Sequence, residues 1–532
     1  MKRILIVLIL VAAWSNIYSQ VNPSVSNYLR YGIGDQEIGE LTKDFEYTEN
    51  VLDFRLGLPQ SITIGFRLQY DQPPEVGPKF KGIKRRFIEY RKDGFYLRGG
   101  DLSEVYGKGM VLNLFENRGI AFDTWLDGIK INYKYKNFDA SLIAGTIDYR
   151  DSIDIARHEI YKLSGGNLNY EINTNLSVGG SFIRAEADIP QFIDESNLIS
   201  ETPEIYLSAN TENFEFFVNY THSWKKDRTL RETYSGYGIY SSGSYFSEGF
   251  GFTLEYKNYR FDITDPFRRF DNSRTSKIFP FQNPPIVMKE HSSTLLSRPI
   301  HEIDFNDEVG LQAEFYYLFN DLTFTLNASV ASRHDLFVYN SSGFNFEIEE
   351  RSSNFLPSLD EEYSPYYEIF LEGEYEYDFS TKFKLGAAYR NKQLYTEIVG
   401  SVATHEITSV VIPAVIKHKL SDIVSTELKY QLEFVNDSYN ASQEDFNNQF
   451  LALLFSFKQK LSLAVRTEFT SNDYDVSGRT SWIVGEVGYR ISSGNTVQIS
   501  YGRERGGLVC TNGVCRYMLP FKGFRFSLQT II

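Results

Sequence analysis

The stretch VGLQAEFYYLFNDLTFTLNASV, residues 309–330, contains two segments in which apolar and polar side chains alternate. A period of two places one apolar face opposite one polar face, as in a half-buried β-strand. Each segment has about ten residues, the length of a tilted strand that crosses a membrane. The apolar positions are Val309, Leu311, Ala313, Phe315 and Tyr317 in the first segment, and Leu322, Phe324, Leu326, Ala328 and Val330 in the second. The stretch predicts a hairpin of two membrane-crossing strands.

The same unit of strand, short turn, strand and longer loop repeats from about residue 126 to the end of the chain. This alternation predicts an all-β fold, a transmembrane up-and-down antiparallel β-barrel with short periplasmic turns and long extracellular loops. A β-sandwich with Greek-key connections would not produce it. The short connections are expected near residues 137, 174, 212, 258, 320, 380, 420, 459 and 494.

The strand count follows from these connections. Nineteen strands are predicted after residue 126, and five more candidates precede it at 26–33, 50–57, 61–71, 84–91 and 94–101. The total of about 24, with a range of roughly 20–26, agrees with the even numbers found in bacterial single-chain barrels. Pro413 lies inside the predicted strand 405–419. Because proline cannot donate to the hydrogen-bond ladder, we expect a bulge there.

The N-terminus has the features of a secretory signal peptide, predicted at residues 1–19. Lys2 and Arg3 precede an apolar run that ends at Ala13, and this order is typical of such peptides. No later stretch reaches the 18 or more apolar residues that a transmembrane helix needs. Residues 20–532 are therefore expected to form one barrel domain in the outer membrane of a Gram-negative cell, with membrane lipid and the barrel-insertion machinery as partners.

The composition supports a barrel with one apolar and one wet face. Aromatic residues make up 16% of the chain, although the mean hydropathy is −0.32. Barrels of the outer membrane carry aromatic girdles at both membrane interfaces. The net charge of −15 would repel nucleic acid, so no nucleic-acid partner is expected.

Two similar motifs predict aromatic girdle positions. Tyr135-Lys136-Asn137-Phe138 and Tyr256-Lys257-Asn258-Tyr259 each place two aromatic residues around Lys-Asn. Asn tolerates the positive φ that a two-residue hairpin loop requires. We therefore predict two tight turns, with Tyr135, Phe138, Tyr256 and Tyr259 in an interfacial girdle.

Charged side chains are expected to face the lumen in pairs of unlike sign. The alternation places Glu368 opposite Arg390, Glu374 opposite Lys384, and Glu376 opposite Lys382. Similar reasoning pairs Glu255 with Arg260, and Lys134 with Asp139. Directly opposed unlike charges stabilise neighbouring strands. The residues form either a charged pore lining that selects solutes or a salt-bridge ladder, and their pairing favours the ladder.

Two segments depart from the regular pattern. Residues 99–125 are rich in glycine and alternate poorly, so they predict either a segment turned into the lumen or a bulged strand. Near the C-terminus, Asn512 and Gly513 predict a two-residue hairpin turn, which makes Cys510 and Cys515 a directly opposed pair. The compartment to which an exported protein is delivered permits the oxidation of cysteine thiols. We therefore predict a disulfide that closes the tip of an external hairpin.

No motif predicts an enzyme or a cofactor. The seven histidines form no metal-spaced pair of the kind found in zinc sites. Nucleophile elbows, phosphate-binding glycine loops and dinucleotide fingerprints are missing from the sequence. Asp262, Asp265 and Asp271 could bind calcium, but a solvated rim explains them more simply. We expect no catalytic residues, no metal site and no cofactor.

Two longer stretches resemble a family of exported Bacteroidota proteins that is defined by a domain of unknown function. They are GGDLSEVYGKGMVLNLFENRGIAFDTWLDG at 99–128 and RGGLVCTNGVCRYMLPFKGF at 505–524. The second matches the family's Cys-x4-Cys-Arg hairpin, whereas Leu102 and Val105-Tyr106 stand where the family pattern has aromatic residues. The resemblance implies an outer-membrane location and no particular activity.

These patterns leave two functional hypotheses. The first is a pore or gated solute channel with loops 272–307 and 335–362 over or within its mouth, because a barrel of this size has room for a water-filled or plugged lumen. The second is a non-transporting structural or assembly subunit whose plugged barrel docks other envelope proteins.

Overall fold

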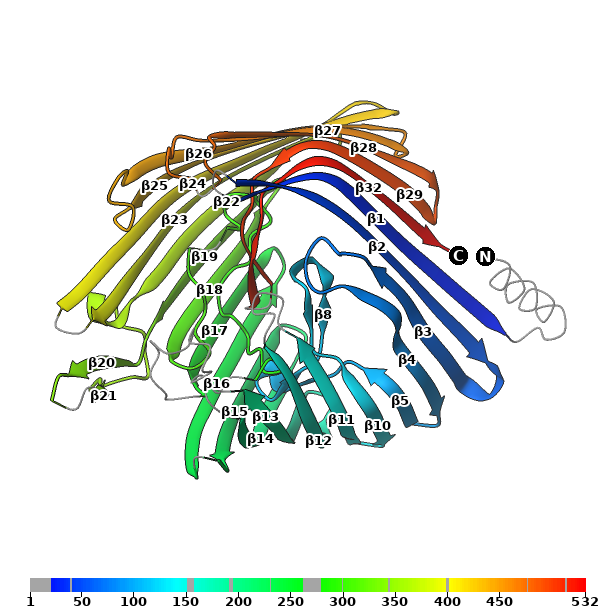
Figure 1. Ribbon diagram of the computed structural model, residues 1–532, viewed down its shortest axis with the longest axis vertical. Helices are drawn as coiled ribbons and strands as arrows, with labels where there is room; N and C mark the ends of the chain where they lie inside the picture. The colour runs from blue at the N-terminus through cyan, green and yellow to red at the C-terminus, as the bar shows by residue number, and fades with distance from the viewer. Residues whose placement is uncertain are drawn as a thin grey trace.

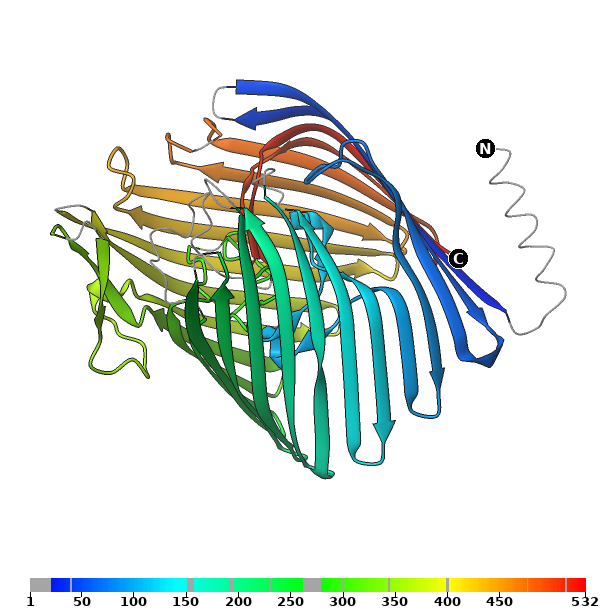
Figure 2. The ribbon, with the colours of Figure 1, turned by 60° about the horizontal axis from the view of Figure 1, so that its bottom comes forward.

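The computed structural model describes residues 21–532 except 39–40, 151–156, 191–194, 230, 262–278, 299, 343–344, 399–400, 476 and 512–513. The predicted signal peptide and Asp262, Asp265 and Asp271 lie outside the described residues. Figures 1 and 2 show long strands that wrap around several central segments. The strands form one sheet of 24, in which every pairing is antiparallel.

The barrel strands follow one another in chain order. They are β1 (Asn22–Ile38), β2 (Leu41–Leu58), β3 (Ile62–Asp71), β4 (Phe80–Lys92), β5 (Phe95–Leu102), β10 (Leu126–Tyr135), β11 (Phe138–Arg150), β12 (His158–Asn173), β13 (Leu176–Pro190), β14 (Glu195–Asn210), β15 (Phe214–Asp227), β16 (Glu232–Ser247), β17 (Phe250–Arg260), β18 (Glu308–Phe319), β19 (Leu322–Ser332), β22 (Tyr366–Asp378), β23 (Thr381–Ile398), β24 (Ser401–Ser421), β25 (Val424–Asp437), β26 (Asp445–Phe457), β27 (Leu461–Thr470), β28 (Ser481–Ser492), β29 (Asn495–Glu504) and β32 (Phe521–Ile531).

Short elements occupy the longer connections. They are β6 (Val105–Tyr106), η2 (Gly107–Gly109), β7 (Leu112–Asn113), β8 (Glu116–Asn117), η3 (Arg118–Ile120), β9 (Phe122–Asp123), β20 (Asp335–Asn340), β21 (Asn345–Glu350), η5 (Glu361–Tyr363), β30 (Gly507–Thr511) and β31 (Val514–Met518), while η1 (Pro59–Ser61) forms a short turn. In the described part of the chain, no helix is long and apolar enough to cross a membrane.

The sheet closes because β1 pairs with β2 on one side and with β32 on the other, where Ser26 lies opposite Ile531. The long connections leave the wall and return to the neighbouring strand, since β5 pairs with β10, β17 with β18, β19 with β22, and β29 with β32. The predicted all-β, up-and-down barrel of 24 strands is confirmed. A closed barrel leaves no strand edge unpaired.

The two faces of the wall differ, as the alternation predicts. On β11, Leu142 is 63% exposed, whereas its neighbours Ser141 and Ile143 are buried. Apolar side chains recur on the outer face of many strands, for example Leu168 and Ile172 on β12, and Ile369 and Leu371 on β22. An outward apolar band is the surface that a barrel presents to lipid.

The predicted turn at Lys257-Asn258 is wrong. Both residues lie inside β17, where Lys257 is opposite Tyr240 on β16 and Gly310 on β18. The chain turns earlier, between β16 and β17, where Gly249 has a φ of +73°. Only glycine adopts such a conformation without steric cost, so the turn forms there and the apolar alternation continues through Lys257.

The predicted bulge at Pro413 is also wrong. Pro413 stays in register opposite Gln431 on β25. On the β23 side, pairing stops after Leu385–Ala414 and resumes at Ala388–Val411 without a shift in register. The missing N–H of proline is therefore accommodated by a local gap in the ladder. Gly386 leaves space there, since a Cβ atom on it would lie 3.1 Å from the Pro413 ring.

Candidate functional site in the barrel lumen

Three connections fold back into the barrel instead of leaving it. We call residues 103–125 the plug, the described residues of 279–307 the strap, and residues 507–518 the hairpin. Figure 1 shows the cyan plug, the green strap and the red hairpin together in the middle of the barrel, and Figure 2 shows the same grouping after rotation. The lumen is the candidate functional site because these segments decide whether it is open.

One side of the plug is apolar and packs against the inner face of β11 to β14. Val111, Leu112 and Leu114 are almost completely buried. They belong to one cluster with inward-facing residues such as Ile147 and Leu163. This part of the wall is therefore apolar on both faces. Close-packed interiors resist rearrangement, so the plug is fixed to its wall.

The strap begins within the same apolar cluster. Phe279 and Phe281 pack around Tyr161, with ring centroids 5.6 and 5.4 Å from it. Backbone hydrogen bonds then join strap and plug, because the Asn113 amide donates to the Phe281 carbonyl at 2.7 Å and the Asn283 amide donates to the Gly109 carbonyl at 3.0 Å.

Gly109 makes this backbone contact possible. Its φ is +94°, and a Cβ atom at this position would lie 2.2 Å from the Asn283 carbonyl oxygen. Only glycine fits such a close approach of two backbones. Within the glycine-rich stretch 99–109, Gly109 thus serves the contact between plug and strap, whereas Gly100 approaches the Arg86 carbonyl and Gly107 the Glu204 carboxylate of the wall.

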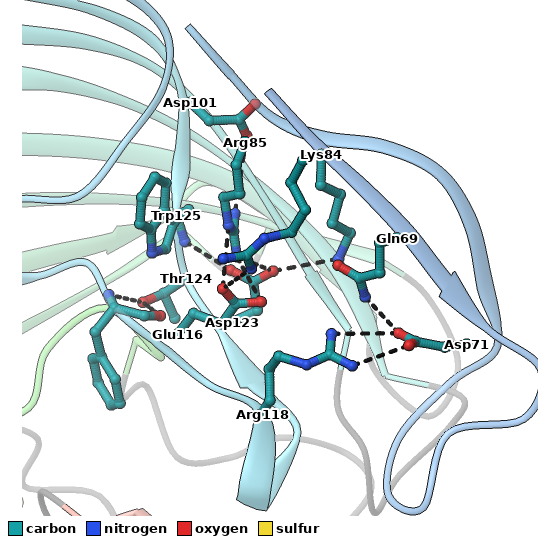
Figure 3. Close-up of polar contacts among 12 residues, drawn as sticks. Gln69, Asp71, Lys84, Arg85, Asp101, Glu116, Arg118, Asp123, Thr124 and Trp125 are labelled. Carbon is teal, nitrogen blue, oxygen red and sulfur yellow. Dashed lines mark hydrogen bonds and ion pairs between the residues drawn. The ribbon is translucent and has the colours of Figure 1, made fainter. Parts of the chain in front are cut away.

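The other side of the plug is charged and faces β2 to β5. Figure 3 shows Arg118 of the plug directed at Asp71 of β3, at 3.0 Å. Arg118 also contacts Glu49 at 3.1 Å. Arg67 of β3 reaches Glu116 of the plug at 2.7 Å. These charge-assisted contacts are stronger than neutral hydrogen bonds, so they fix the orientation of the plug.

Arg85 is the centre of the charged side. It lies at a bulge in β4, where the register shifts between Gly65 and Arg67 of β3, and its φ is +55°. Bulges redirect side chains at functional positions. The guanidinium contacts Asp123 at 2.7 Å and Glu116 at 3.2 Å, as Figure 3 shows. It also lies 4.3 Å from the ring centroid of Trp125.

Asp123 responds to these cations. Burial is the largest single influence and opposes ionisation of its carboxyl, but the attraction of Arg85 and Lys84, together with hydrogen bonds from Arg85 and the Trp125 amide, lowers the pKa of Asp123 below its ordinary value. Since a depressed carboxyl pKa stabilises the folded state above the ordinary pKa, the contact between plug and wall is complete at neutral pH.

Beyond the plug, the strap crosses to the opposite wall and is held mainly by polar groups. His291 contacts Glu368 at 2.7 Å, and Arg298 contacts Glu468 at 2.5 Å. The Leu295 amide donates to the Gln431 side chain at 2.8 Å. Leu295 and Leu296 belong to a small apolar cluster of six buried residues. Val287 and Phe305 pack in a second small cluster with Met110 of the plug, so the apolar contacts of the strap are divided among three clusters, whereas those of the plug lie mainly in one.

Some of the predicted ladder residues form ion pairs with one another on the wall, and the others contact the strap. The register pairs Glu368 with Arg390, Glu374 with Lys384, and Glu376 with Lys382. Lys382 forms ion pairs with Glu376 and, at 3.7 Å, with Glu374. Glu368 instead holds His291 of the strap. Arg390 contacts Glu433 at 2.7 Å and donates to the Arg298 carbonyl at 3.0 Å.

The other two predicted charge pairs have different outcomes. Lys134 lies opposite Asp139 in the register, although its ammonium contacts Glu171 at 3.2 Å. The pairing of Glu255 with Arg260 is wrong, because both residues lie on β17. Glu255 accepts a hydrogen bond from Tyr240, and Arg260 contacts Asp335. This error follows directly from the misplaced turn.

Only the first of the two predicted girdle motifs lies at a tight turn, and its place in a girdle stays a prediction. Tyr135 and Phe138 are half exposed beside the tight turn at Lys136-Asn137, and Phe138 packs against Tyr170. Tyr256 lies near the far end of β17 and contacts Phe355. Tyr259 is fully buried and donates to the Pro285 carbonyl of the strap at 2.9 Å. Neither belongs to the predicted girdle.

The hairpin joins the last two wall strands, as predicted, but it does not extend outward. Its register places Cys510 opposite Cys515, while the turn residues Asn512 and Gly513 lie outside the described residues. Gly507, with a φ of +138°, lies at the point where the chain bends toward the lumen. The disulfide stays a prediction.

Sequence reasoning missed most of the contacts that hold the lumen segments. Arg85, Arg118, His291 and Arg298 belong to no recognisable motif, and Arg298 lies 170 residues from its partner Glu468. The one usable signal was the glycine-rich stretch before Met110. In the described part of the chain, no group of three His, Cys, Asp or Glu side chains could hold a metal ion.

Comparisons with known proteins describe the family and the fold. The model of the "Family of unknown function (DUF6029)" matches residues 1–532. No curated protein matches the sequence.

Among solved structures, the chain is similar to the siderophore receptor PirA from Pseudomonas aeruginosa, with 8% identity, 96% of this chain and 80% of that chain covered, and a TM-score of 0.47. It is also similar to the copper transporter OprC, with 10% identity, coverage of 97% and 81%, and a TM-score of 0.45. The translocation pore of the P pilus usher PapC has 9% identity, coverage of 95% and 99%, and a TM-score of 0.46. TM-scores below 0.5 carry no substrate or mechanism over to this chain.

Proposed function

The chain belongs to the family of unknown function DUF6029, and we propose that it is a gated solute channel of the outer membrane. The membrane location is supported by the closed sheet and by the apolar residues on its outer face. Because lipid offers no hydrogen bonds to an open sheet edge, a closed barrel is the arrangement of strands that can span a bilayer. Lipid and the barrel-insertion machinery are its proposed partners.

The gating part of the proposal depends on the way the strap is held. A barrel of this size encloses a lumen wide enough for a water-filled or plugged channel. The plug is fixed to one wall by an apolar core, whereas the strap crosses to the other wall through side-chain ion pairs and a small apolar cluster. We propose that the strap moves to open the channel while the plug stays in place.

The test is the conductance of purified protein in planar lipid bilayers. The intact chain should give a small or intermittent conductance. A variant in which residues 288–298 are replaced by a short Gly-Ser linker should conduct continuously, because the strap's contacts with Glu368, Gln431 and Glu468 are removed. An electrically silent strap variant that is folded and inserted would contradict the channel proposal.

A second candidate, a docking subunit of an envelope complex, is favoured by one observation. The β20–β21 hairpin stands beside the barrel in both views, and it carries the exposed Ile348. Phe355, Leu356 and Leu359, which follow it, are also exposed. Deletion of residues 335–350 should then remove stoichiometric partners from affinity-purified native membranes. The same deletion is the control for the strap variant, because it should leave the conductance unchanged.

A further inference from the structure

A cavity of about 280 Å³ lies where the strap, the hairpin and the barrel wall meet. The strap contributes Arg298, the hairpin contributes Leu508 and Met518, and the wall contributes Arg466 and Trp482. Small-molecule sites are usually concave and mostly apolar, with a few directed polar groups, and begin at about this size. The cavity thus has the dimensions of a site for a small ligand.

Arginine is the commonest charged residue in the lining. Four arginines, Arg298, Arg466, Arg503 and Arg505, face two glutamates, Glu468 and Glu504. Each arginine does form an ion pair: Arg466 contacts Glu504 at 3.1 Å, for example, and Arg505 contacts Asp475 at 2.7 Å. Because Glu37, Asp475 and Glu486 pair with these arginines from outside the lining, an anionic ligand is favoured by donor atoms that lack an acceptor and not by a net positive charge.

Several donors in this lining lack an acceptor. Trp482 is 3% exposed, and its indole nitrogen has no hydrogen-bond partner among the described residues. The same holds for Arg298 Nη1 and Arg466 Nε. Buried donors without acceptors are costly and uncommon in native proteins. An anion that enters the cavity would supply acceptor oxygens to these groups after small side-chain rotations.

The cavity also offers an apolar surface. Arg505 lies 4.7 Å from the ring centroid of Trp482, and the guanidinium and indole together present flat groups. Phe450, Leu508 and Met518 complete this part of the lining. An inorganic ion has no apolar group to pack against such a surface, whereas a compact organic ring can pack against it.

We propose that this cavity binds a small organic anion that combines a carboxylate with a compact ring, of which a sugar acid is the simplest example. Resting on the proposed channel function, the proposal makes this anion the solute that the channel admits. Because the cavity is built from both strap and wall, bound anion contacts the segment whose movement opens the lumen.

The binding test uses the folded full-length protein in detergent and isothermal titration calorimetry. The probes are glucuronate, glucose and inorganic phosphate. We expect glucuronate to bind at least tenfold more tightly than glucose, which has the ring without the carboxylate, and than phosphate, which has charge without the ring. Equal affinities for glucuronate and either of the other probes would overturn the proposal.

Two variants test the residues directly. Arg466→Gln removes a cation, and Trp482→Phe keeps a ring but removes the indole donor, so each should weaken glucuronate binding at least tenfold. Arg184→Gln is the matched control, because Arg184 has the same 42% side-chain exposure as Arg466 and an ion pair with Glu201. It lies on β13, away from the cavity. If Arg466→Gln fails to fold, Arg298→Gln replaces it. Unchanged binding in the folded cavity variants would contradict the site.

The site and the channel can fail separately. Glucuronate binding together with a silent strap variant would retain the site and overturn the channel. Continuous conductance of the strap variant, with no glucuronate binding to the intact chain, would retain the channel and overturn the site.

Discussion

The plug and the strap fill the same lumen in different ways. The plug buries a continuous apolar face against β11 to β14 and ties its charged face to β2 to β5. The strap shares the plug's apolar core at Phe279 and Phe281, then crosses the lumen on ion pairs, hydrogen bonds and two small apolar clusters. Apolar cores lose many contacts at once when they open, whereas ion pairs can exchange protein partners for water. The proposed channel would thus combine, in one barrel, a plug that stays in place and a strap that moves.

The largest effect is expected at Arg85. In Arg85→Ala, Glu116 loses one of its cations and Asp123 keeps only a contact of 3.4 Å with Lys84. Removing one member of a buried ion pair costs about 3–5 kcal/mol, so the free energy of unfolding in urea should fall by that amount. Arg86→Ala is the control, because Arg86 is 67% exposed and pairs with Asp127. An equal loss in both variants would mean that the charged side does not fix the plug.

The next effect compares two fully buried leucines, Leu112 of the plug and Leu295 of the strap. Leu112→Ala should lower the free energy of unfolding by about 2–5 kcal/mol, which is the usual cost of such a cavity. Leu295→Ala should change global unfolding much less and increase the open time in planar bilayers. Similar unfolding losses without any conductance change would erase the distinction between the two segments.

His291→Gln should have a moderate effect on opening. The variant weakens the strap's contact with Glu368, and a hydrogen bond to a charged group contributes about 1.5–3 kcal/mol. The ratio of open to closed times should rise roughly tenfold for every 1.4 kcal/mol lost, as measured by single-channel recording. His158→Gln is the control, since His158 pairs with Asp148 outside the strap. An unchanged ratio would show that His291 does not hold the strap closed.

Acidification should open the strap through His301. Burial lowers the pKa of His301 below 6.5, and Lys392 and Lys257 act in the same direction, while Glu308 opposes them. The packed strap therefore keeps His301 neutral. A released strap regains the ordinary pKa and takes up a proton as the pH falls through about 6.5.

This linkage has a direct measurement. Between pH 7.5 and 5.5, protease cleavage of the strap in the purified protein should accelerate, by at most about tenfold per pH unit below 6.5. His301→Gln should flatten the response. A steep response that persists in the variant would assign the pH dependence to another group.

The smallest effect concerns the hairpin. A disulfide between Cys510 and Cys515 would close a very small ring, which stabilises the tip by at most ~2 kcal/mol. Without reductant, a thiol reagent should not label the purified protein, and after reduction it should label both cysteines. Ready labelling of the cysteines before reduction would contradict the predicted disulfide.

Sequence alternation predicted the wall well because a period of two is a local property of each strand. It gave the strand number and the register of β22 against β23, including Glu374 opposite Lys384. It failed at Lys257-Asn258, because the resemblance of this motif to the true turn at Lys136-Asn137 was given more weight than the alternation, which continues through Lys257. The glycine at 249 was the better signal.

The candidate site was much less predictable. The bulge that turns Arg85 inward depends on the pairing of β4 with β3, and the contact of Arg298 with Glu468 joins residues 170 positions apart. No periodicity encodes such contacts. Glycine at 109 signalled a close backbone approach, but its partner Asn283 could not be read from the sequence.

The contacts that fill the lumen are separated along the chain. The contacts of the plug described above involve residues between Glu49 and Asn283, so they need little more than the first half of the chain. The strap's distal partners come later, at Glu368, Gln431 and Glu468, and the last strand seals the sheet. The early half can thus assemble around its own filling, which would serve as an internal template for the curvature of the strands added afterwards.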